Sequence, residues 1–599
     1  MRFLLLPQGQ TVRTTSSHCT IRDYRQSPTA RGMVVILAPH SHLPACPAQS
    51  LRRRQPAWSR LPLYPPSRHL PGGGAPFLAP CLTPNIQWPE ITPIRPGHRD
   101  CPSPATLRSR KVTTPTAPRE VPSSSGPMPV VRHTHVSLGL PPEIWAAVGV
   151  SCIYAATTTG YLSSADGKIM FWQAVALALH HSIHFPSPVQ GPGSLIWNSK
   201  YGIGLSLLYL PGILLTRLID PTLVAHAIRP TSPSQWELFA IAGTPVQIGV
   251  TVATTVLVSV LVRELGSSRR WALAAMLMYG IASPAFVYAR LDFAQPLEGL
   301  CYVLAIVATL RANRLGSDKS RWVAACASIL AVLTRPVEGT LLLPAILLTA
   351  RGRKSRLIPI AGYLLGIAVT LLVNWLRFSS PLTTGYGAET FTTPLWVGLA
   401  GALLSPGRGL AWALPVSVFS PLGVRYLLRR GSGAVTFALV YLCIGLLLLV
   451  SAWNIWWGGY DWGLRLYLPA MPVVVALGTL GLAALEARVA RIFSILVGGL
   501  GAFWCLPGVV ENGYLYEVMA NGTKASWALS AYPPSGAWQF FEGWLGRGTV
   551  GHTAYSDILW LVLAPASNGI TIVFMFLLLL AGIATLSVSA AAALSPAGS

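Results

Sequence analysis

From residue 143 to residue 590, runs of apolar residues alternate with short polar loops, the pattern of a chain that crosses a membrane many times. A helix needs about 20 apolar residues to cross a bilayer. Segments 322–334 and 339–350 are shorter, and Arg335-Pro336 between them predicts a break near the outer membrane surface. We predict an all-α polytopic membrane protein with about twelve transmembrane helices. The predicted spans are 143–162, 237–262, 271–289, 295–312, 322–334, 339–350, 357–376, 409–427, 434–452, 467–485, 492–509 and 567–590.

Basic loops set the predicted orientation, because Lys and Arg favour the cytoplasmic side of a membrane. If the apolar segment 201–218 also crossed, the basic residues 263–270 would lie opposite Arg132 and every later basic loop. We therefore predict an interfacial or re-entrant helix there, within a long first outer loop, residues 163–236, and both termini inside. The other predicted outer loops are 376–408, 453–466 and 510–566.

Composition supports this class of protein. The 599-residue chain is 52% hydrophobic and only 11% charged, which excludes a soluble globular enzyme and a disordered chain. Its net charge of +24 does not require a nucleic acid partner, because basic cytoplasmic loops produce the same excess. We therefore expect a multi-pass protein of the cell membrane, in contact with the lipid bilayer.

Residues 1–127 differ from the rest. They hold 22 of the 50 Pro residues and no apolar run long enough to cross a bilayer, so they cannot build a core. We interpret them as a disordered Pro/Arg-rich tail or as mis-annotated upstream sequence, with the functional protein, 128–599, starting near Met128.

Several Lys and Arg residues lie on the predicted outer side or at its membrane border, although these residue types favour the cytoplasmic side. A charge within a span costs at least ~2.5 kcal/mol and is usually paired or functional. Several outer loops each supply an Arg or Lys, so we predict a common polyanion, such as a lipid phosphate or pyrophosphate, at the outer membrane border. Alternatively, each Arg reaches the lipid head groups independently. The residues are Asp166, Lys168, Lys200, Arg290, Asp292, Arg335, Arg377, Arg408, Asp461 and Arg465.

The first outer loop contains the main catalytic candidate. Asp166 follows the first span and precedes an amphipathic helix predicted over residues 169–185. A lone carboxylate there can act as the general base for an acceptor hydroxyl or amine, or it can cap the helix. Lys200 and Tyr201 stand where the helix 201–218 begins, which predicts a phosphate site or, alternatively, an interfacial anchor.

Two further patterns are open to two interpretations. His180 and His184 share one face of the predicted amphipathic helix, which favours an interfacial His cluster over a metal site because no acid or Cys lies at a motif distance. The segment 453–465 combines Trp457 and Trp462 with Asp461, and such aromatic faces stack on sugars or anchor at head groups.

In order along the chain, several motifs resemble a bacterial branch of the GT-C membrane glycosyltransferases. They are similar to phospholipid-carrier-dependent transferases, including the protein O-mannosyltransferases and the lipid A aminoarabinose transferases. The resemblance covers residues 143 to about 590. The motifs are Ser163-x-x-Asp166-Gly167, Ser199-Lys200-Tyr201-Gly202-x-Gly204, Thr334-Arg335-Pro336, Asn374-x-x-Arg377-Phe378-x-x-Pro381, Leu404-Ser405-Pro406-Gly407-Arg408 and Trp457-Gly458-Gly459-x-x-Trp462-Gly463-x-Arg465.

This resemblance implies a GT-C-like bundle, a polyprenyl-phosphate-linked sugar donor, an active site on the outer face and inversion at the anomeric carbon. It implies that Asp166 is the base and that Lys200 holds the donor phosphate. The relatives show a second acid where this chain has Gly167, which leaves use of a divalent metal such as Mg or Mn open. They also carry an acid directly before a Pro, whose role either falls to Asp292 or is absent here.

We therefore predict a hexosyl or pentosyl transferase whose acceptor is a lipid, a glycan or a protein. Cations aimed at the leaving phosphate would stabilise the transition state, and we assign this role to Lys200, Arg335, Arg377 and Arg465. The alternative is a transporter or flippase of lipid-linked or anionic solutes, which would place its charges near the middle of the membrane. The predicted further substrate contacts are Tyr201, Asp292, Arg408, Trp457, Asp461 and Trp462.

Overall fold

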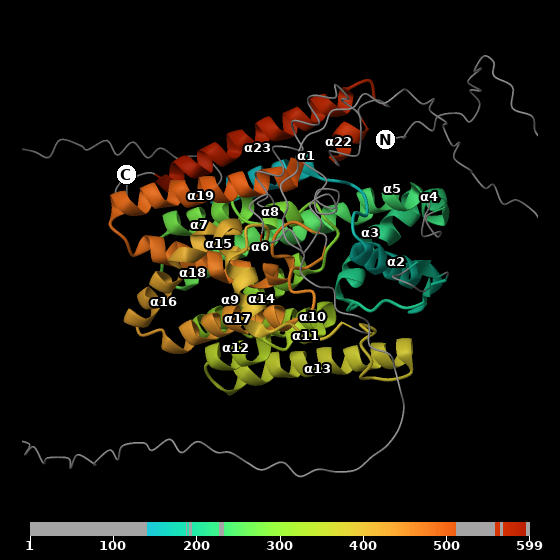
Figure 1. Ribbon diagram of the computed structural model, residues 1–599, viewed down its shortest axis with the longest axis horizontal. Helices are drawn as coiled ribbons and strands as arrows, with labels where there is room; N and C mark the ends of the chain where they lie inside the picture. The colour runs from blue at the N-terminus through green and yellow to red at the C-terminus, as the bar shows by residue number, and fades with distance from the viewer. Residues whose placement is uncertain are drawn as a thin grey trace, which may run out of the picture. The chain divides into compact units, whose positions relative to one another are not determined.

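The computed structural model describes residues 141–186, 188–190, 195–226, 233–387, 389–459, 461–510, 527, 558–563 and 567–594. All of them belong to the unit Pro127–Ser599. The predicted tail 1–127 and most of the predicted outer loop 510–566 lie outside the described residues. The described part is almost entirely helical (Figure 1).

The helices follow one another with short connections. The α-helices are α1 (Pro142–Thr157), α2 (Ala165–His180), α3 (Gly204–Ile219), α4 (Pro221–His226), α5 (Pro233–Ala242), α6 (Thr244–Glu264), α7 (Arg269–Ile281), α8 (Ala285–Tyr288), α9 (Gln295–Leu315), α10 (Asp318–Thr334), α11 (Pro336–Gly339), α12 (Leu342–Thr349), α13 (Arg353–Phe378), α14 (Leu395–Leu404), α15 (Leu410–Ala413), α16 (Ser420–Arg429), α17 (Gly433–Ala452), α18 (Met471–Ala483), α19 (Ala487–Val510), α22 (Leu559–Val562) and α23 (Ile570–Leu594). Two 3-10 helices, η1 (Pro415–Phe419) and η2 (Arg465–Ala470), precede α16 and α18. Two short strands, β1 (Val189–Gln190) and β2 (Leu195–Ile196), pair antiparallel.

Six helical segments in the described part of the chain are long and apolar enough to cross a membrane. Together with the composition they indicate a membrane protein, although the predicted count of about twelve spans is not confirmed. The predicted span 409–427 is not one continuous helix: Pro415 and Pro421 divide it into α15, η1 and α16, because proline cannot continue the hydrogen bonding of a preceding helix. The six segments are Glu237–Glu264, Arg353–Phe378, Gly433–Ala452, Arg465–Ala483, Ala487–Val510 and Ile570–Ala591.

Helix pairs pack closely around the core. α1 packs along α23, α9 packs against both α6 and α10, and α10 packs along α13 (Figure 1). A Cβ atom at Gly362 of α13 would lie 2.6 Å from the carbonyl oxygen of Ala325 on α10. A small residue is therefore needed where these two helices approach, as is common between membrane helices.

The basic loops meet at one end of the bundle, because hydrogen bonds join them to one another and to the start of α1. The opposite ends of α1, α10, α13 and α17 lead into a second cluster of charged residues, described below. The joining bonds are Arg269 Nε to Glu143 Oε1 (2.7 Å), Arg311 Nε to Glu264 Oε1 (3.0 Å), Arg430 NH1 to Gly266 O (2.7 Å) and Arg351 N to Asn313 Oδ1 (2.8 Å).

The two helices predicted in the first outer loop are present as α2 and α3, but the exposure of their faces differs from expectation. α2, predicted to be amphipathic, is buried on most of its sides. It is α3 that keeps an exposed apolar face, which includes Leu218 and Ile219. With 16 residues α3 is about 24 Å long, too short for a full crossing, and such a face suits a membrane interface.

The predicted shared face of His180 and His184 is wrong. α2 ends at His180, and the next residue, His181, has a left-handed backbone with φ of 49°. His184 therefore lies outside the helix, where its Nδ1 lies 2.7 Å from Oδ1 of Asn198. Within the described residues, no group of three or more His, Cys, Asp or Glu side chains is arranged to hold a metal ion.

Candidate functional site

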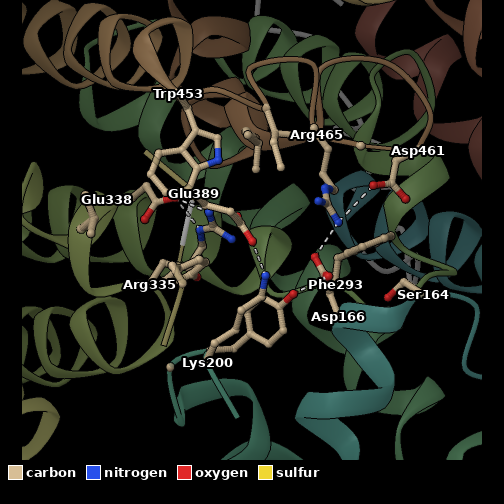
Figure 2. Close-up of a pocket in the computed structure, with 18 of the residues that line it drawn as sticks. Ser164, Asp166, Lys200, Phe293, Arg335, Glu338, Glu389, Trp453, Asp461 and Arg465 are labelled. Atoms are coloured by element: carbon tan, nitrogen blue, oxygen red, sulfur yellow. Dashed lines mark hydrogen bonds and ion pairs between the residues drawn. The ribbon is translucent and has the colours of Figure 1, made fainter. Parts of the chain in front are cut away.

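A cavity of about 720 Å³ lies where the start of α2, the segment before α3, the ends of α10 and α13, and the loop before η2 converge (Figure 2). The structure brings together in this cavity residues that are far apart in the sequence, such as Asp166 and Arg465, which are separated by 299 positions. Ten of the residues selected from the sequence line it: Asp166, Lys200, Tyr201, Arg290, Arg335, Arg377, Trp457, Asp461, Trp462 and Arg465.

Asp166 lies in the first turn of α2, but it is not the cap of that helix. Ser164 is the N-cap, and its hydroxyl accepts a hydrogen bond from the backbone N–H of Gly167 at 2.7 Å. The carboxylate of Asp166 is instead free to point into the cavity, where Tyr201 donates its phenolic hydrogen to it. The capping interpretation is therefore wrong.

Asp166 is also not a lone carboxylate. Its Oδ2 lies 2.9 Å from a guanidinium nitrogen of Arg465. Burial alone would raise the pKa of Asp166, but the charges of Arg465 and Lys200 and the hydrogen bond from Tyr201 outweigh burial and hold the pKa below its ordinary value. Asp166 is therefore ionised at neutral pH and able to accept a hydrogen bond or a proton.

Arg465 joins two acids through one nitrogen atom. Its NH1 is 2.9 Å from Asp166 and 3.0 Å from Asp461, and its guanidinium lies over the ring of Phe293 at 4.4 Å (Figure 2). Burial raises the pKa of Asp461 to about 6, even though Arg465 acts in the opposite direction. The two carboxyl groups therefore differ in acidity while sharing a single cation.

The predicted phosphate-binding cations Lys200 and Arg335 each pair with an acid that the sequence analysis did not select. Nζ of Lys200 lies 2.5 Å from Oε1 of Glu389, and it stands over the rings of Tyr201 and Tyr386 at 5.3 and 5.1 Å. Nε of Arg335 donates to Glu338 at 2.8 Å. Figure 2 shows both pairs on the side of the cavity opposite Asp461.

Of the four cations predicted to bind the donor phosphate, Arg377 is the one for which the described part of the chain supplies no ion pair. It is 5% exposed, and it donates to the carbonyl oxygen of Tyr201 at 2.8 Å and to Oε1 of Gln173 at 3.3 Å. Its Nε has no hydrogen-bond partner among the described residues. Arg377 thus offers the cavity a positive charge that no described carboxylate neutralises.

Asp292 and Arg408, both predicted as substrate contacts, do not line the cavity. Asp292 is fully buried and accepts hydrogen bonds from the hydroxyl of Ser163 at 2.8 Å and from the backbone N–H of Ser164 at 3.2 Å. It therefore positions the turn that presents Asp166. Arg408, 1% exposed, donates to backbone carbonyl groups of the loop that carries Asp461, including Gly459 at 2.9 Å.

Gly167 stands where the sequence resemblance predicts a second acid, and the structure leaves no room for one there. A Cβ atom at this position would collide with the carboxylate of Asp292. Asp292, from the loop before α9, thus fills the space beside Asp166 that a neighbouring acid would need. Burial raises the pKa of Asp292 to about 6, although the hydrogen bonds from Ser163 and Ser164 act in the opposite direction.

Sequence reasoning missed the acids Glu338 and Glu389 and the aromatic residues Tyr386 and Trp453, which also line the cavity. The ring of Tyr386 packs edge-on against those of Tyr201 and Trp453, with ring centres 6.2 and 6.0 Å apart. The sequence does contain one indication of the two acids. The chain has only 20 acidic residues, so an acid in a predicted outer loop is rare enough to be a site candidate by itself.

No protein family model matches the sequence, and no curated protein matches it. Among solved structures, the chain is similar to ArnT from Cupriavidus metallidurans in the apo state, with a TM-score of 0.43, 12% identity and coverage of 75% of this chain and 76% of that one. The same ArnT bound to undecaprenyl phosphate gives a TM-score of 0.40, 11% identity and the same coverage.

A third similar structure is the oligosaccharyltransferase of Archaeoglobus fulgidus in complex with Zn and sulfate. Its TM-score is 0.39 at 14% identity, and the match covers 68% of this chain and 55% of that one. These proteins are GT-C glycosyltransferases, the class that the sequence motifs resemble.

Proposed function

We propose that this protein transfers a sugar from a polyprenyl-phosphate-linked donor to an acceptor at the outer face of the membrane. One observation carries the proposal: at the end of a bundle of apolar helices, a single cavity holds the ionised carboxylate of Asp166 together with Lys200, Arg335, Arg377 and Arg465. An acid that accepts a proton and cations that bind a phosphate are the two parts such a transfer needs.

The apolar side of the same cavity supports a lipid-linked donor. Leu333 from α10, Val373 from α13 and Leu449 and Val450 from α17 line it next to the cations. A phosphate at the cationic side would leave its polyprenyl chain beside these helices, two of which are long and apolar enough to cross the membrane.

In the proposed reaction, an oxygen of the acceptor attacks the anomeric carbon of the donor sugar. The bond from that carbon to the phosphate oxygen breaks, and its electron pair remains on the phosphate, whose negative charge grows. Lys200, Arg335 and Arg377 stabilise this charge more in the transition state than in the ground state. Asp166 takes the proton of the acceptor hydroxyl, and attack from the face opposite the phosphate inverts the anomeric centre.

Arg465 holds the Asp166 carboxylate in place from one side and Tyr201 holds it from the other. We infer that these two contacts fix the carboxylate oxygens toward the acceptor, so that little reorganisation is needed during transfer. Trp457, which is half-buried in the same region, offers aromatic surface to a sugar ring. Trp462 is 1% exposed and packs against Trp504, so we assign it a supporting role.

The test is transfer of label from a panel of radiolabelled polyprenyl-phosphate sugars to an envelope extract, by the purified protein in liposomes. We expect label in a product for wild type and at least a 1000-fold loss for Asp166→Asn, by analogy with removal of an essential catalytic group. The matched control is Asp318→Asn, which removes a 67% exposed carboxylate at the basic end and should leave transfer unchanged.

Wild-type turnover by Asp166→Asn would refute the role of the base. Label that crosses the bilayer without entering a product would instead establish the transporter or flippase. Parallel assays with Mg²⁺, with Mn²⁺ and with a chelator test the divalent metal that the motif resemblance leaves open.

A further inference from the structure

The formal charges that line the cavity nearly cancel. The cations are Lys200, Arg290, Arg335, Arg377 and Arg465. The acids are Asp166, Glu338, Glu389 and Asp461. With all nine groups ionised, the lining carries a net charge of +1, whereas a site built to hold a multiply charged phosphate group would carry a larger excess.

This balance matters because the proposed reaction changes the charge of the lipid phosphate. The donor is a phosphodiester with one negative charge. After the sugar leaves, the carrier is a phosphomonoester with about two negative charges at slightly alkaline pH. A lining with one excess positive charge matches the donor better than the spent carrier.

Three of the four acids are bound to arginines. Asp166 and Asp461 share Arg465, and Glu338 accepts from Arg335. Glu389 differs, because within the described residues its ion-pair partner is Lys200, with 2.5 Å between Oε1 and Nζ. It therefore neutralises the lysine that the proposed mechanism assigns to the donor phosphate.

The segment that carries Glu389 is fixed by the neighbouring loop. The carbonyl oxygen of Thr390 accepts from the backbone N–H of Asn454 at 2.9 Å, and the hydroxyl of Thr393 donates to the carbonyl oxygen of Trp453 at 2.7 Å. With 26% of each side chain exposed, Glu389 and Lys200 both face the open part of the cavity. The negative charge beside Lys200 is thus built into the site.

We propose that Glu389 determines the charge specificity of the phosphate site, by favouring a lipid phosphodiester over a lipid phosphomonoester. The carboxylate repels the second negative charge of the monoester more strongly than it opposes the single charge of the diester. It thereby lets the spent carrier leave after transfer. This inference rests on the proposed function and deepens it, because it names the ionic form of the lipid that the site prefers.

The test compares the binding of two probes to the purified full-length protein in detergent at pH 8: a short-chain polyprenyl phosphate and its methyl phosphodiester. Each is titrated by calorimetry. Wild type should bind the diester at least as tightly as the monoester. Glu389→Gln should tighten monoester binding by about tenfold and diester binding by less than about threefold. Glu389→Ala should do the same and replaces the Gln variant if that variant does not fold.

Two controls isolate the charge effect. Glu389→Asp retains the carboxylate and should preserve the wild-type preference. Glu143→Gln removes one negative charge from an ion pair with Arg269 at the opposite end of the bundle, and it should change neither affinity.

An equal change for both probes in the Gln and Ala variants, or no change for either, would overturn the role of Glu389 while leaving the proposed function intact. If wild type binds neither probe, the proposed function itself fails, and the inference fails with it.

Discussion

At the residue scale, the site is organised by cations that are already paired. Lys200, Arg335 and Arg465 each contact a carboxylate of the same chain, whereas Arg377 contacts a carbonyl and an amide oxygen. An anionic substrate therefore competes with internal acids for three of these cations. The cost of separating a largely buried pair means that affinity for the donor depends on the acids as much as on the basic residues.

Lys200→Ala should weaken binding of the lipid-linked donor, because it removes a charged donor from the proposed phosphate site. We expect the KM for the donor to rise about tenfold or more, since a hydrogen bond to a charged group contributes roughly 1.5–3 kcal/mol. The measurement is initial rate against donor concentration. Lys168→Ala is the control and should leave KM unchanged, because Lys168, although selected from the sequence, is exposed in the first turn of α2 and does not line the cavity. An unchanged donor dependence in Lys200→Ala would remove that residue from the phosphate site.

Asp292 should make stability depend on pH. Burial raises its folded-state pKa from 3.8 to about 6, so the folded carboxyl group holds its proton more tightly than the unfolded one. The stabilisation is complete below about pH 4 and is lost as pH rises through about 6; it amounts to at most about 3 kcal/mol. The thermal unfolding midpoint of wild type should therefore fall more between pH 4 and pH 7 than that of Asp292→Asn. Parallel curves for the two proteins would contradict this assignment.

At the element scale, α2 shows what a local pattern omits. The sequence predicts a helix after Asp166, and the structure has one from Ala165 to His180. Its predicted exposed polar face is absent, because α3 and neighbouring segments cover it and bury Gln173 as well as Ile169 and Phe171. A helix that is covered on most sides cannot be distinguished by its own periodicity from one at a membrane interface.

Gly167 lies where the start of α2 contacts the loop before α9. A side chain there collides with Asp292, so Gly167→Ala should displace the start of α2 and with it Asp166. We expect a loss of about 1–3 kcal/mol of stability and a large loss of transfer activity, measured by thermal unfolding and by the transfer assay.

The matched control is Gly249→Ala in the long helix α6, where nothing lies within 4 Å of the added Cβ. It should be neutral or slightly stabilising, because alanine favours a helix more than glycine does. If Gly167→Ala behaves in the same way as this control, Asp292 does not constrain the turn that carries Asp166.

At the scale of the whole molecule, the described bundle has two chemically different ends. Basic loops joined by Glu143 and Glu264 form one end, and the cavity with its paired acids and cations forms the other. α13 connects the two, and its 26 residues are about 39 Å long, more than the roughly 30 Å of a bilayer core.

This arrangement gives a prediction about sidedness. In a background without native cysteines, a cysteine at Thr392, on the exposed loop near the cavity, should react with a membrane-impermeant maleimide in intact cells. A cysteine at Lys319, on the exposed start of α10 at the basic end, should react only after the cells are opened. Labelling of both positions from the same side would overturn the proposed outer-face site.

The sequence by itself determined the class of molecule, the positions of most helices and most of the cavity's charged residues. The reason is that membrane burial imposes long apolar segments, and any charge left among them stands out. Arg465 and Asp166 were both selected on this basis.

Only the tertiary structure decided which charges pair. Lys200 and Glu389 are 189 residues apart, and no local pattern relates them; the packing of α10 along α13 and the loop that follows α13 bring them to 2.5 Å. The same long-range packing turned Asp292 and Arg408 into supports of the site. The apolar pattern along the chain reflects whether each segment lies in lipid or in water. Ion pairing and burial depend instead on contacts between segments that are distant in the sequence.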